Sequence, residues 1–425
     1  MNRYVFAVCL YAITLSASSA DTSTSPSPHS LTEAISQGHS LSSFRLRYEQ
    51  VEQQGLDPDA HATTLRTLLG WQTAALNGVS AGLQLINVAK LQDHYNDKAN
   101  GVNQPGHAGY PVVADPDFTG INQLYLDWTR LPETKLRLGR QSVKLDNVRF
   151  IGNVEFRQVM QVFDGVSVEN KSLKDVDLYA AQFTRHRNIN TALRSDHTGI
   201  LNARWRLSAS ESLTGYGYFY DQNEVALASD ISSRTLGVRA DGTRPLNDGW
   251  KLLYTAEYAK QDAWAGSRDR TAAQGQVDAH YHRLGAGLGW QDWSVRFDQE
   301  RLSSNGGKYA FQTPLGTNHL FQGWVDKFLV TPNAGLRDNF ITASGKLGKL
   351  RLLSEFHWLD SDRPFASGSG TGTRYGTEWD VAVGYDFRKD VLAKIEYGHF
   401  IEKNPYSAAR YRDTRKLWIT MLHTF

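Results

Sequence analysis

The residues whose chemistry stands out are arginines on the polar positions of segments in which polar and apolar residues alternate. In residues 44–49, for example, Arg45 and Arg47 alternate with apolar and aromatic side chains. Successive residues of a strand point to opposite faces of its sheet, so guanidinium groups of one parity share a face. The arginines that this parity places together are Arg45, Arg47, Arg66, Arg137, Arg204, Arg206, Arg239, Arg283, Arg296 and Arg351.

Two uses of this arginine face remain open. A guanidinium stays charged at any relevant pH and grips a carboxylate in a planar fork, so a ladder of arginines attracts anions. The arginines could instead pair with acidic residues of the same parity and brace the sheet. These acidic residues are Glu49, Asp127, Glu257, Asp298, Glu300, Glu355, Glu378, Asp380 and Glu396. We expect some arginines to pair and the rest to line a passage in which binding is weak enough for solutes to leave.

Further cationic residues lie in or beside two long segments without strand alternation. Arg140, Arg149 and Arg157 belong to the first, residues 141–164, which also carries Phe150, Ile151 and Phe156. Because this segment is too apolar to extend into water, we predict that it folds into the interior of the sheet as a constriction. The second segment, residues 306–337, carries Lys327 and could meet the first there. The alternative is that both segments pack together as an external lid.

The elements that must position these residues are strands. Period-2 alternation dominates from residue 44 to the end, and we count about eighteen strands. Short connections such as residues 77–78 and 291–292 alternate with long ones, which are 93–119, 141–164, 221–233, 261–279, 303–338 and 360–374. Tryptophans recur near strand ends, as membrane interfaces favour. The pattern predicts an all-β, antiparallel, up-and-down transmembrane barrel with short periplasmic turns and long extracellular loops. A soluble barrel is the alternative.

The last residues read as a strand that closes this barrel. Leu417, Ile419, Met421 and Phe425 share one parity, and the chain ends on the aromatic residue. Bilayer hydrocarbon satisfies no free N–H or C=O group, so the first strand must pair with the last. We expect the barrel assembly machinery to recognise this strand through Phe425.

Composition and the N-terminus agree with an exported protein. Residues 1–20 combine a short basic start, an apolar run and small residues, which predicts a signal peptide. We expect a periplasmic leader over 21–40 and the barrel over 41–425. The single cysteine, Cys9, lies in the signal peptide, so the mature chain has no disulfide or thiolate site. The net charge of +2 and the absence of a basic tail argue against nucleic acid.

The remaining motifs offer little chemistry. The glycine-rich residues 368–374 lack the Gly-Lys-Ser/Thr of a phosphate loop, and we predict a flexible external loop there. Asp115 with Asp117, and Asp360 with Asp362, could hold Ca²⁺ in loops, but solvated turns are the simpler interpretation. We expect no other cofactor or metal. A hydrolase barrel would need a nucleophile activated by a base, and we predict that the protein is not an enzyme.

Four stretches go beyond a generic barrel. They are Phe44-Arg-Leu-Arg-Tyr-Glu49; Ala62-Thr-Thr-Leu-Arg-Thr67; Arg137-Leu-Gly-Arg-Gln141 with Asp146-Asn-Val-Arg-Phe-Ile-Gly152, Phe156-Arg-Gln158 and Phe163-Asp164; and Thr313-Pro-Leu-Gly-Thr-Asn-His319 with Gly323-Trp-Val-Asp-Lys-Phe-Leu329. Together they resemble the alginate export family of outer-membrane proteins, over about residues 31–425.

This resemblance implies a monomeric barrel of eighteen strands in the bacterial outer membrane. It implies an arginine-rich lumen that passively passes anionic polysaccharide, sugar acids or other carboxylates. The expected partners are membrane lipid, lipopolysaccharide and the anionic solute. A surface receptor or adhesin that uses the long loops is the alternative function, and an outer-membrane hydrolase is a more remote one.

Overall fold

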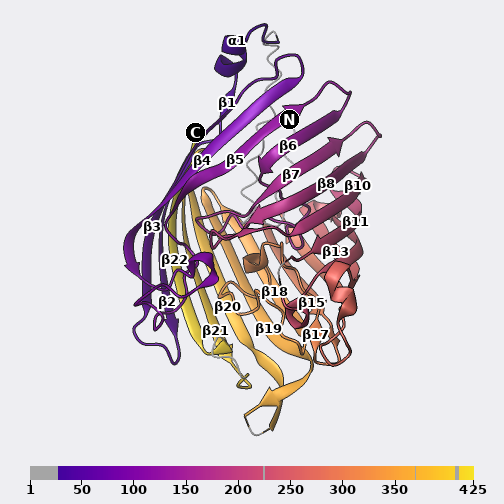
Figure 1. Cartoon of the computed structure of the whole chain (residues 1–425). Coiled ribbons are helices and arrows are strands. Elements are labelled where there is room, and N and C mark those ends of the chain that lie inside the picture. Colours follow the sequence, from indigo (N-terminus) through magenta and orange to yellow (C-terminus); the bar gives the residue numbers. More distant parts are fainter. Residues whose placement is uncertain (1–26, 224, 369, 407–410) are drawn as a thin grey trace.

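The computed structural model describes residues 27–223, 225–368, 370–406 and 411–425, which form a barrel of long tilted strands (Figure 1). The barrel strands are β2 (Ser43–Gln53), β3 (Ala60–Gln72), β4 (Val79–His94), β5 (Phe118–Trp128), β6 (Thr134–Gln141), β7 (Val162–Asn170), β8 (Val176–Arg187), β10 (His197–Arg206), β11 (Glu211–Asp221), β12 (Ser233–Pro245), β13 (Trp250–Ala263), β14 (Asp278–Trp290), β15 (Trp293–Leu302), β18 (Leu336–Leu347), β19 (Leu350–Ser367), β20 (Gly370–Arg388), β21 (Val391–Glu402) and β22 (Thr414–Thr424).

The sheet closes on itself. Each of these strands pairs in antiparallel fashion with its neighbours along the chain, and β2 pairs with β22 from Ser43 opposite Thr424 to Gln53 opposite Thr414. The Phe425 amide donates to the Ser42 carbonyl at 3.2 Å. The predicted barrel of 18 antiparallel strands is therefore confirmed, together with the closing role of the last strand.

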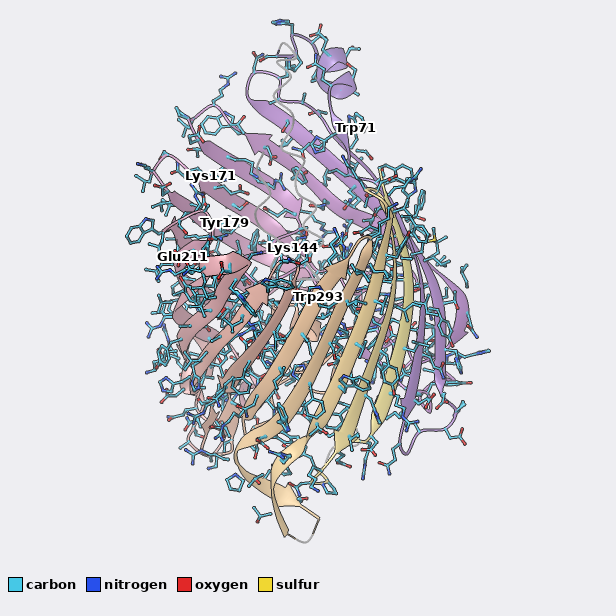
Figure 2. All side chains as sticks on the ribbon, turned by 180° about the vertical axis from the view of Figure 1, so that it is seen from behind. Trp71, Lys144, Lys171, Tyr179, Glu211 and Trp293 are labelled. Atoms are coloured by element: carbon cyan, nitrogen blue, oxygen red, sulfur yellow. The ribbon has the colours of Figure 1, made fainter. Side chains whose placement is uncertain are left out.

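Strand alternation separates an apolar outer face from a polar inner face. In β2, Phe44 and Leu46 are 38% and 43% exposed, whereas Arg45 and Arg47 are 5% and 2% exposed. Large apolar side chains stay exposed on the outward parity of other strands too, and Leu126, Leu284 and Ile419 are examples. Trp71 and Trp293 lie outside near strand ends, toward the short turns (Figure 2). This pattern matches a barrel that presents its outer surface to lipid.

The two rims differ as expected. One rim carries short turns, among them residues 291–292, 348–349 and 389–390, and the other carries long loops at 95–117, 142–161 and 303–335. The predicted loop over 360–374 is wrong, because β19 and β20 continue as a hairpin to Ser367 and Gly370. Within this hairpin, the ring of Phe365 stacks on the ring of Tyr375, with 4.8 Å between the ring centroids. Residue 369 of the predicted glycine-rich loop lies outside the described residues.

Small elements lie before β2 and in the connections between the barrel strands. They are α1 (Leu31–Ser36), β1 (His39–Ser40), β9 (Leu193–Arg194), β16 (Ser304–Asn305), β17 (Tyr309–Ala310), η1 (Ala99–Gly101), η2 (Leu227–Ser229), η3 (Asn247–Gly249), η4 (Ala265–Asp269) and η5 (Asn318–Leu320). Within the predicted leader, α1 docks on the turn after β3, since the Ala74 amide donates to the Ala34 carbonyl at 2.8 Å. The predicted signal peptide, residues 1–20, and residues 21–26 lie outside the described part. No helix among the described residues has the length and apolarity to cross a membrane.

Candidate functional site in the barrel interior

Two long connections turn into the space that the strands enclose (Figure 1). We call residues 142–161, between β6 and β7, the first lumen loop, and residues 303–335, between β15 and β18, the second lumen loop. Gln158 of the first loop donates to Thr64 Oγ1 on the inner face of β3 at 2.8 Å. In the second loop, the indole of Trp324 donates to Glu355 of β19 at 3.0 Å. Both segments fold into the barrel interior as predicted, so the external lid is wrong, and their role as a constriction stays a prediction.

Aromatic packing holds the first lumen loop against the wall. The ring of Phe150 lies 5.2 Å from the rings of Tyr216 and Tyr281, which point inward from β11 and β14. It also contacts Phe311 of the second lumen loop at 6.0 Å. Both loops therefore share one apolar cluster with the wall, and this cluster narrows the lumen.

Arg157 joins the two loops and the wall through carboxylates. Its guanidinium donates to Glu49 of β2 at 2.9 Å and to Asp326 of the second loop at 2.8 Å. Lys416 of β22 donates to the same Asp326 oxygen at 2.9 Å. Burial alone would raise the pKa of Asp326, but Lys416, His319 and Arg157 together hold that pKa well below its usual range. Arg157 therefore fastens the two lumen loops to the wall through two carboxylates.

Arg149 likewise bonds to internal partners, although its Nη2 is buried without one among the described residues. Its side chain is 1% exposed, and Nε donates to Glu300 of β15 at 2.7 Å. Its Nη1 donates to Thr313 and Asn318 of the second loop at 3.2 and 3.0 Å. The sequence-based expectation placed Arg149 and Arg157 among solute-binding residues, but the structure gives both to the pairing alternative.

The second loop approaches the wall closely at Gly323. The Val325 amide donates to Glu378 Oε1 at 2.6 Å, and a Cβ on Gly323, whose φ is +84°, would meet the Glu378 carboxyl carbon at 2.3 Å. Lys327 nearby is buried, and its amine donates to Thr414 of β22 at 2.6 Å. Burial, followed by the positive charge of Lys416, lowers the pKa of Lys327 to about 7. Lys327 thus anchors the loop.

A different arrangement surrounds Arg45, Arg47 and Arg66, which we call the arginine patch. Arg45 and Arg66 lie directly opposite each other on β2 and β3. Arg45 donates to the Glu155 carbonyl at 2.7 Å and to Gln158 Oε1 at 2.8 Å, and Arg47 donates to the Phe156 carbonyl at 2.5 Å. Arg66 Nε and Nη1 are buried with no acceptor among the described residues. No described carboxylate forms an ion pair with these guanidinium groups, although Asp115 and Glu155 are near enough to act on Arg45 and Arg66 electrostatically.

Glu155 shows what the arginine patch does to a carboxylate nearby. It pairs with Lys144 at 3.0 Å, and both side chains remain partly exposed. Lys144 lies inside the barrel and is visible through its open mouth (Figure 2). Although burial opposes ionisation, Lys144 and then Arg66, with a smaller effect from Arg45, lower the pKa of Glu155. The patch therefore stabilises a negative carboxylate at the surface of the constriction.

Most other predicted arginines face the interior but are paired with carboxylates on the wall. The pairs are Arg137 with Asp127, Arg206 with Asp177, Arg239 with Asp241, Arg283 and Arg296 with Asp298, and Arg351 with Asp386. Arg204 lies opposite the inward-facing Thr214, is exposed, and has no ion pair among the described residues. The predicted mixture of paired and unpaired arginines therefore holds for this set.

The predicted position of Arg140 in the lumen is wrong, because its side chain lies on the outer face. It lies opposite Leu124, whose side chain is 51% exposed on the outer face. It binds Asp164 there at 2.7 and 2.8 Å. The reason is parity: Arg140 follows the inward-facing Arg137 by three residues in the same strand, so the two point to opposite faces. Arg140 is not a lumen residue.

Sequence reasoning missed two cations of the inner wall, Lys394 and Lys416. Lys416 binds Asp326, and Lys394 binds Glu396 of the same strand at 2.8 Å. The signal was present, since Lys394 alternates with the outward Ile395 and Lys416 with the outward Ile419.

The aspartates considered as Ca²⁺ ligands, and one serine motif typical of hydrolases, lie in other structural settings. Asp115 receives the Gln158 amide at 2.7 Å, and Asp360 and Asp362 bind Arg374 and Arg301. No cluster of three metal-ligating side chains occurs in the ranges that the structure covers. The run Gly78-Val-Ser-Ala-Gly82 has the spacing of a nucleophile elbow, but Ser80 lies inside β4 rather than on a strand-to-helix turn.

Comparison with known proteins agrees with this architecture. The family model described as alginate export matches residues 42–320. No curated protein matches the chain. The solved structure of OccAB2 from Acinetobacter baumannii is similar with a TM-score of 0.69 and 15% identity, over 92% of this chain and 99% of that one. OccK9 (OpdG) of Pseudomonas aeruginosa gives 0.68 and 12%, over 92% and 98%. OpdK of Pseudomonas aeruginosa with vanillate gives 0.63 and 13%, over 92% and 98%.

Proposed function

Because the chain belongs to the alginate export family and forms an outer-membrane barrel, we propose that it is a passive channel for carboxylate solutes. Sugar acids and uronate oligomers are the solutes that we infer. The observation that carries the proposal is the arginine patch, where Arg45, Arg47 and Arg66 share no carboxylate within ion-pair distance in the described residues. All three side chains are buried, but no described carboxylate forms an ion pair with them, in contrast to Arg149 and Arg157.

The patch suits a solute that must enter and leave. Arg45 and Arg47 are held by loop carbonyls and Gln158. The patch is therefore preorganised, but it is not neutralised, because neutral acceptors do not cancel charge. Fixed guanidinium groups lower the barrier for an anion, and binding that is weak and repeated lets the anion move on. The Glu155 carboxylate already rests beside these groups, which supports a preference for carboxylates.

A similar fold has been solved with a carboxylate. OpdK of Pseudomonas aeruginosa has been solved with vanillate, an aromatic carboxylate. At 13% identity the similarity concerns the fold alone. It supports the proposal only because a barrel of similar fold has been solved together with a carboxylate.

Planar bilayer recordings test the proposal. Purified protein should open channels that prefer chloride over potassium and that uronate oligomers block. Arg45→Gln with Arg66→Gln should lower the anion-to-cation permeability ratio by a factor of about three or more, because two fixed charges are lost at the narrow level. Glu155→Gln should change the ratio in the opposite direction. Arg140→Gln is the matched control, because it removes an arginine from the outer face.

The outcomes discriminate clearly. A silent bilayer with correctly folded protein contradicts the channel. Open channels whose selectivity is the same in the Arg45/Arg66 double variant and in wild type contradict the role of the arginine patch. The double variant should keep its heat-resistant, fast-migrating form on a gel, which confirms that the barrel has closed.

A further inference from the structure

The outer face of the barrel carries a transverse row of charged side chains near the long-loop rim. Consecutive register pairs join His282 to Arg301, Arg301 to Arg337, Arg337 to Asp360, and Asp360 to Arg374, across β14, β15, β18, β19 and β20. We call these five residues the basic row. They share the outward parity of Phe297 and Ile341, which are 50% and 40% exposed on the same strands.

Charges in the basic row do not balance. Both Asp360 oxygens accept from Arg374, at 2.6 and 3.2 Å, and Arg301 takes Asp362 at 2.5 Å. Arg337 has no hydrogen-bond or ion-pair partner among the described residues, although it lies directly between Arg301 and Asp360. Like charges directly opposite each other destabilise a sheet. A bridging anion would remove this repulsion.

A second feature of the same face points to an anion attached to acyl chains. A shallow cavity of about 410 Å³ lies on the outer surface, lined by Phe356, Thr377, Trp379, His399 and Ile401. Phe356 precedes Asp360 by four residues, so the cavity begins roughly 13 Å below the basic row, toward the middle of the membrane. Basic side chains at headgroup level above an apolar hollow at chain level fit an amphiphile rather than a free ion.

We propose that the basic row and this cavity form a docking site for a phosphorylated glycolipid of the outer leaflet, of the lipid A type. A phosphate lies between Arg301 and Arg337, which grip it through charge-assisted hydrogen bonds. An acyl chain occupies the hollow beside Phe356 and Trp379. The site faces away from the lumen, so it does not depend on which solute passes or on whether the channel conducts.

The test is native mass spectrometry of the full barrel in detergent, titrated with bisphosphorylated lipid A. Arg301→Gln with Arg337→Gln should weaken retention by about tenfold or more, because two charge-assisted contacts to one phosphate are lost. Arg234→Gln is the matched control: its side chain is 42% exposed on the outer face of β12 and already pairs with Asp262 at 3.2 Å. This variant should bind lipid A as wild type does.

Two further arms keep the outcome unambiguous. Asp360→Asn frees Arg374 and should tighten lipid A binding, so a loss or no change overturns the proposal even where the double variant fails to fold. Dephosphorylated lipid A should bind wild type and the double variant equally weakly. Unchanged lipid A affinity in a folded double variant overturns the site. Displacement of lipid A by millimolar inorganic phosphate overturns the glycolipid assignment in favour of a free anion.

Discussion

At the scale of single residues, the partner of each guanidinium decides its role. A buried ion pair gains little net stability from its attraction, but removal of one partner leaves an uncompensated charge in a dry site. Arg149 with Glu300 and Arg157 with Glu49 and Asp326 are such pairs. They hold the two lumen loops against the wall, whereas the arginine patch forms no ion pair among the described residues, and we propose that its charge acts on a passing anion.

Arg149→Ala should therefore loosen the first lumen loop rather than change selectivity alone. Glu300, whose side chain is 1% exposed, would lose its cation. Loss of one member of a buried pair costs roughly 3–5 kcal/mol. We expect larger and noisier single-channel currents, measured in planar bilayers at fixed voltage.

The control for this prediction is Arg206→Ala. Arg206 pairs with Asp177 where both side chains are substantially exposed, at 42% and 29%. Exposed pairs of this kind contribute about 0–1 kcal/mol, so the current trace should keep its wild-type noise. Equal effects of the two substitutions would show that burial of the Arg149 pair is irrelevant to the constriction.

The face to which a strand residue points can be predicted from the sequence, but the partners of the lumen-loop residues cannot. Parity correctly turns Arg45, Arg47 and Arg66 inward, because an alternating strand leaves only two choices. Strand parity also places Arg140 on the outer face, but the prediction grouped Arg140 with the lumen loop and so placed it inside. The partners of the lumen-loop residues could not be predicted, since Arg45 and Gln158 are 113 positions apart.

At the scale of elements, the two lumen loops behave as anchored inserts. Their apolar residues explain why they leave water, and this much is visible in Phe150, Ile151 and Phe156. The exact positions of the two loops depend on contacts with wall residues from distant strands, such as Thr64, Glu378 and Thr414. Such contacts carry no local sequence signal. The sequence therefore predicts that the loops turn inward, but not which wall residues anchor them.

The anchor at Lys327 predicts a pH-dependent second lumen loop. The pKa of Lys327 falls from its ordinary value near 10.5 to about 7 in the folded protein. The unfolded chain therefore binds more protons between these values, and stability rises with pH across that window. Below about pH 7 the amine is charged while buried near Lys416, so the full penalty applies. We expect loop-related current fluctuations to increase as pH falls from 8 to about 6.

Lys327→Met is the informative variant. Methionine fills a similar volume without a charge, so the variant should keep quiet currents across the same pH range. Lys416, Asp326, Glu378 and Glu402 all act on Lys327. Asp326 stays ionised over that range because its pKa is held low. If the methionine variant retains the wild-type pH response, another group titrates and Lys327 is only a packing residue.

At the scale of the whole molecule, closure of the sheet determines the architecture. Each strand supplies N–H and C=O groups that hydrocarbon cannot satisfy, so the membrane admits the sheet only as a ring. This requirement made the class of fold readable from alternation and from the final strand. It sets no limit on strands beyond the membrane, so β19 and β20 extend past Asp360, where the sequence predicts a loop.

The seam between β2 and β22 leads to a prediction about assembly. The Phe425 ring is 60% exposed and meets Phe44 edge-on at 5.5 Å. An aromatic pair of this kind is worth roughly 0.5–1.5 kcal/mol beyond its buried area, which is small beside a seam that runs from Ser43 to Gln53. Phe425→Ala should therefore leave refolded protein heat-resistant in detergent. If the assembly machinery reads this terminus, the same variant should reach the outer membrane in several-fold lower yield in cells.

Phe387→Ala separates recognition from simple loss of an aromatic side chain. Phe387 is 50% exposed on the outer face of β20, near the same short-turn rim, but it is not at the chain end. Its substitution should lower neither refolding nor yield in cells, because the seam and the terminus are intact. Equal yields for the Phe425 variant and wild type, measured by fractionation and heat-modified migration, would remove the terminal aromatic residue from any role in assembly. Equal losses for both variants would assign the effect to the interfacial aromatic belt rather than to the end of the closing strand.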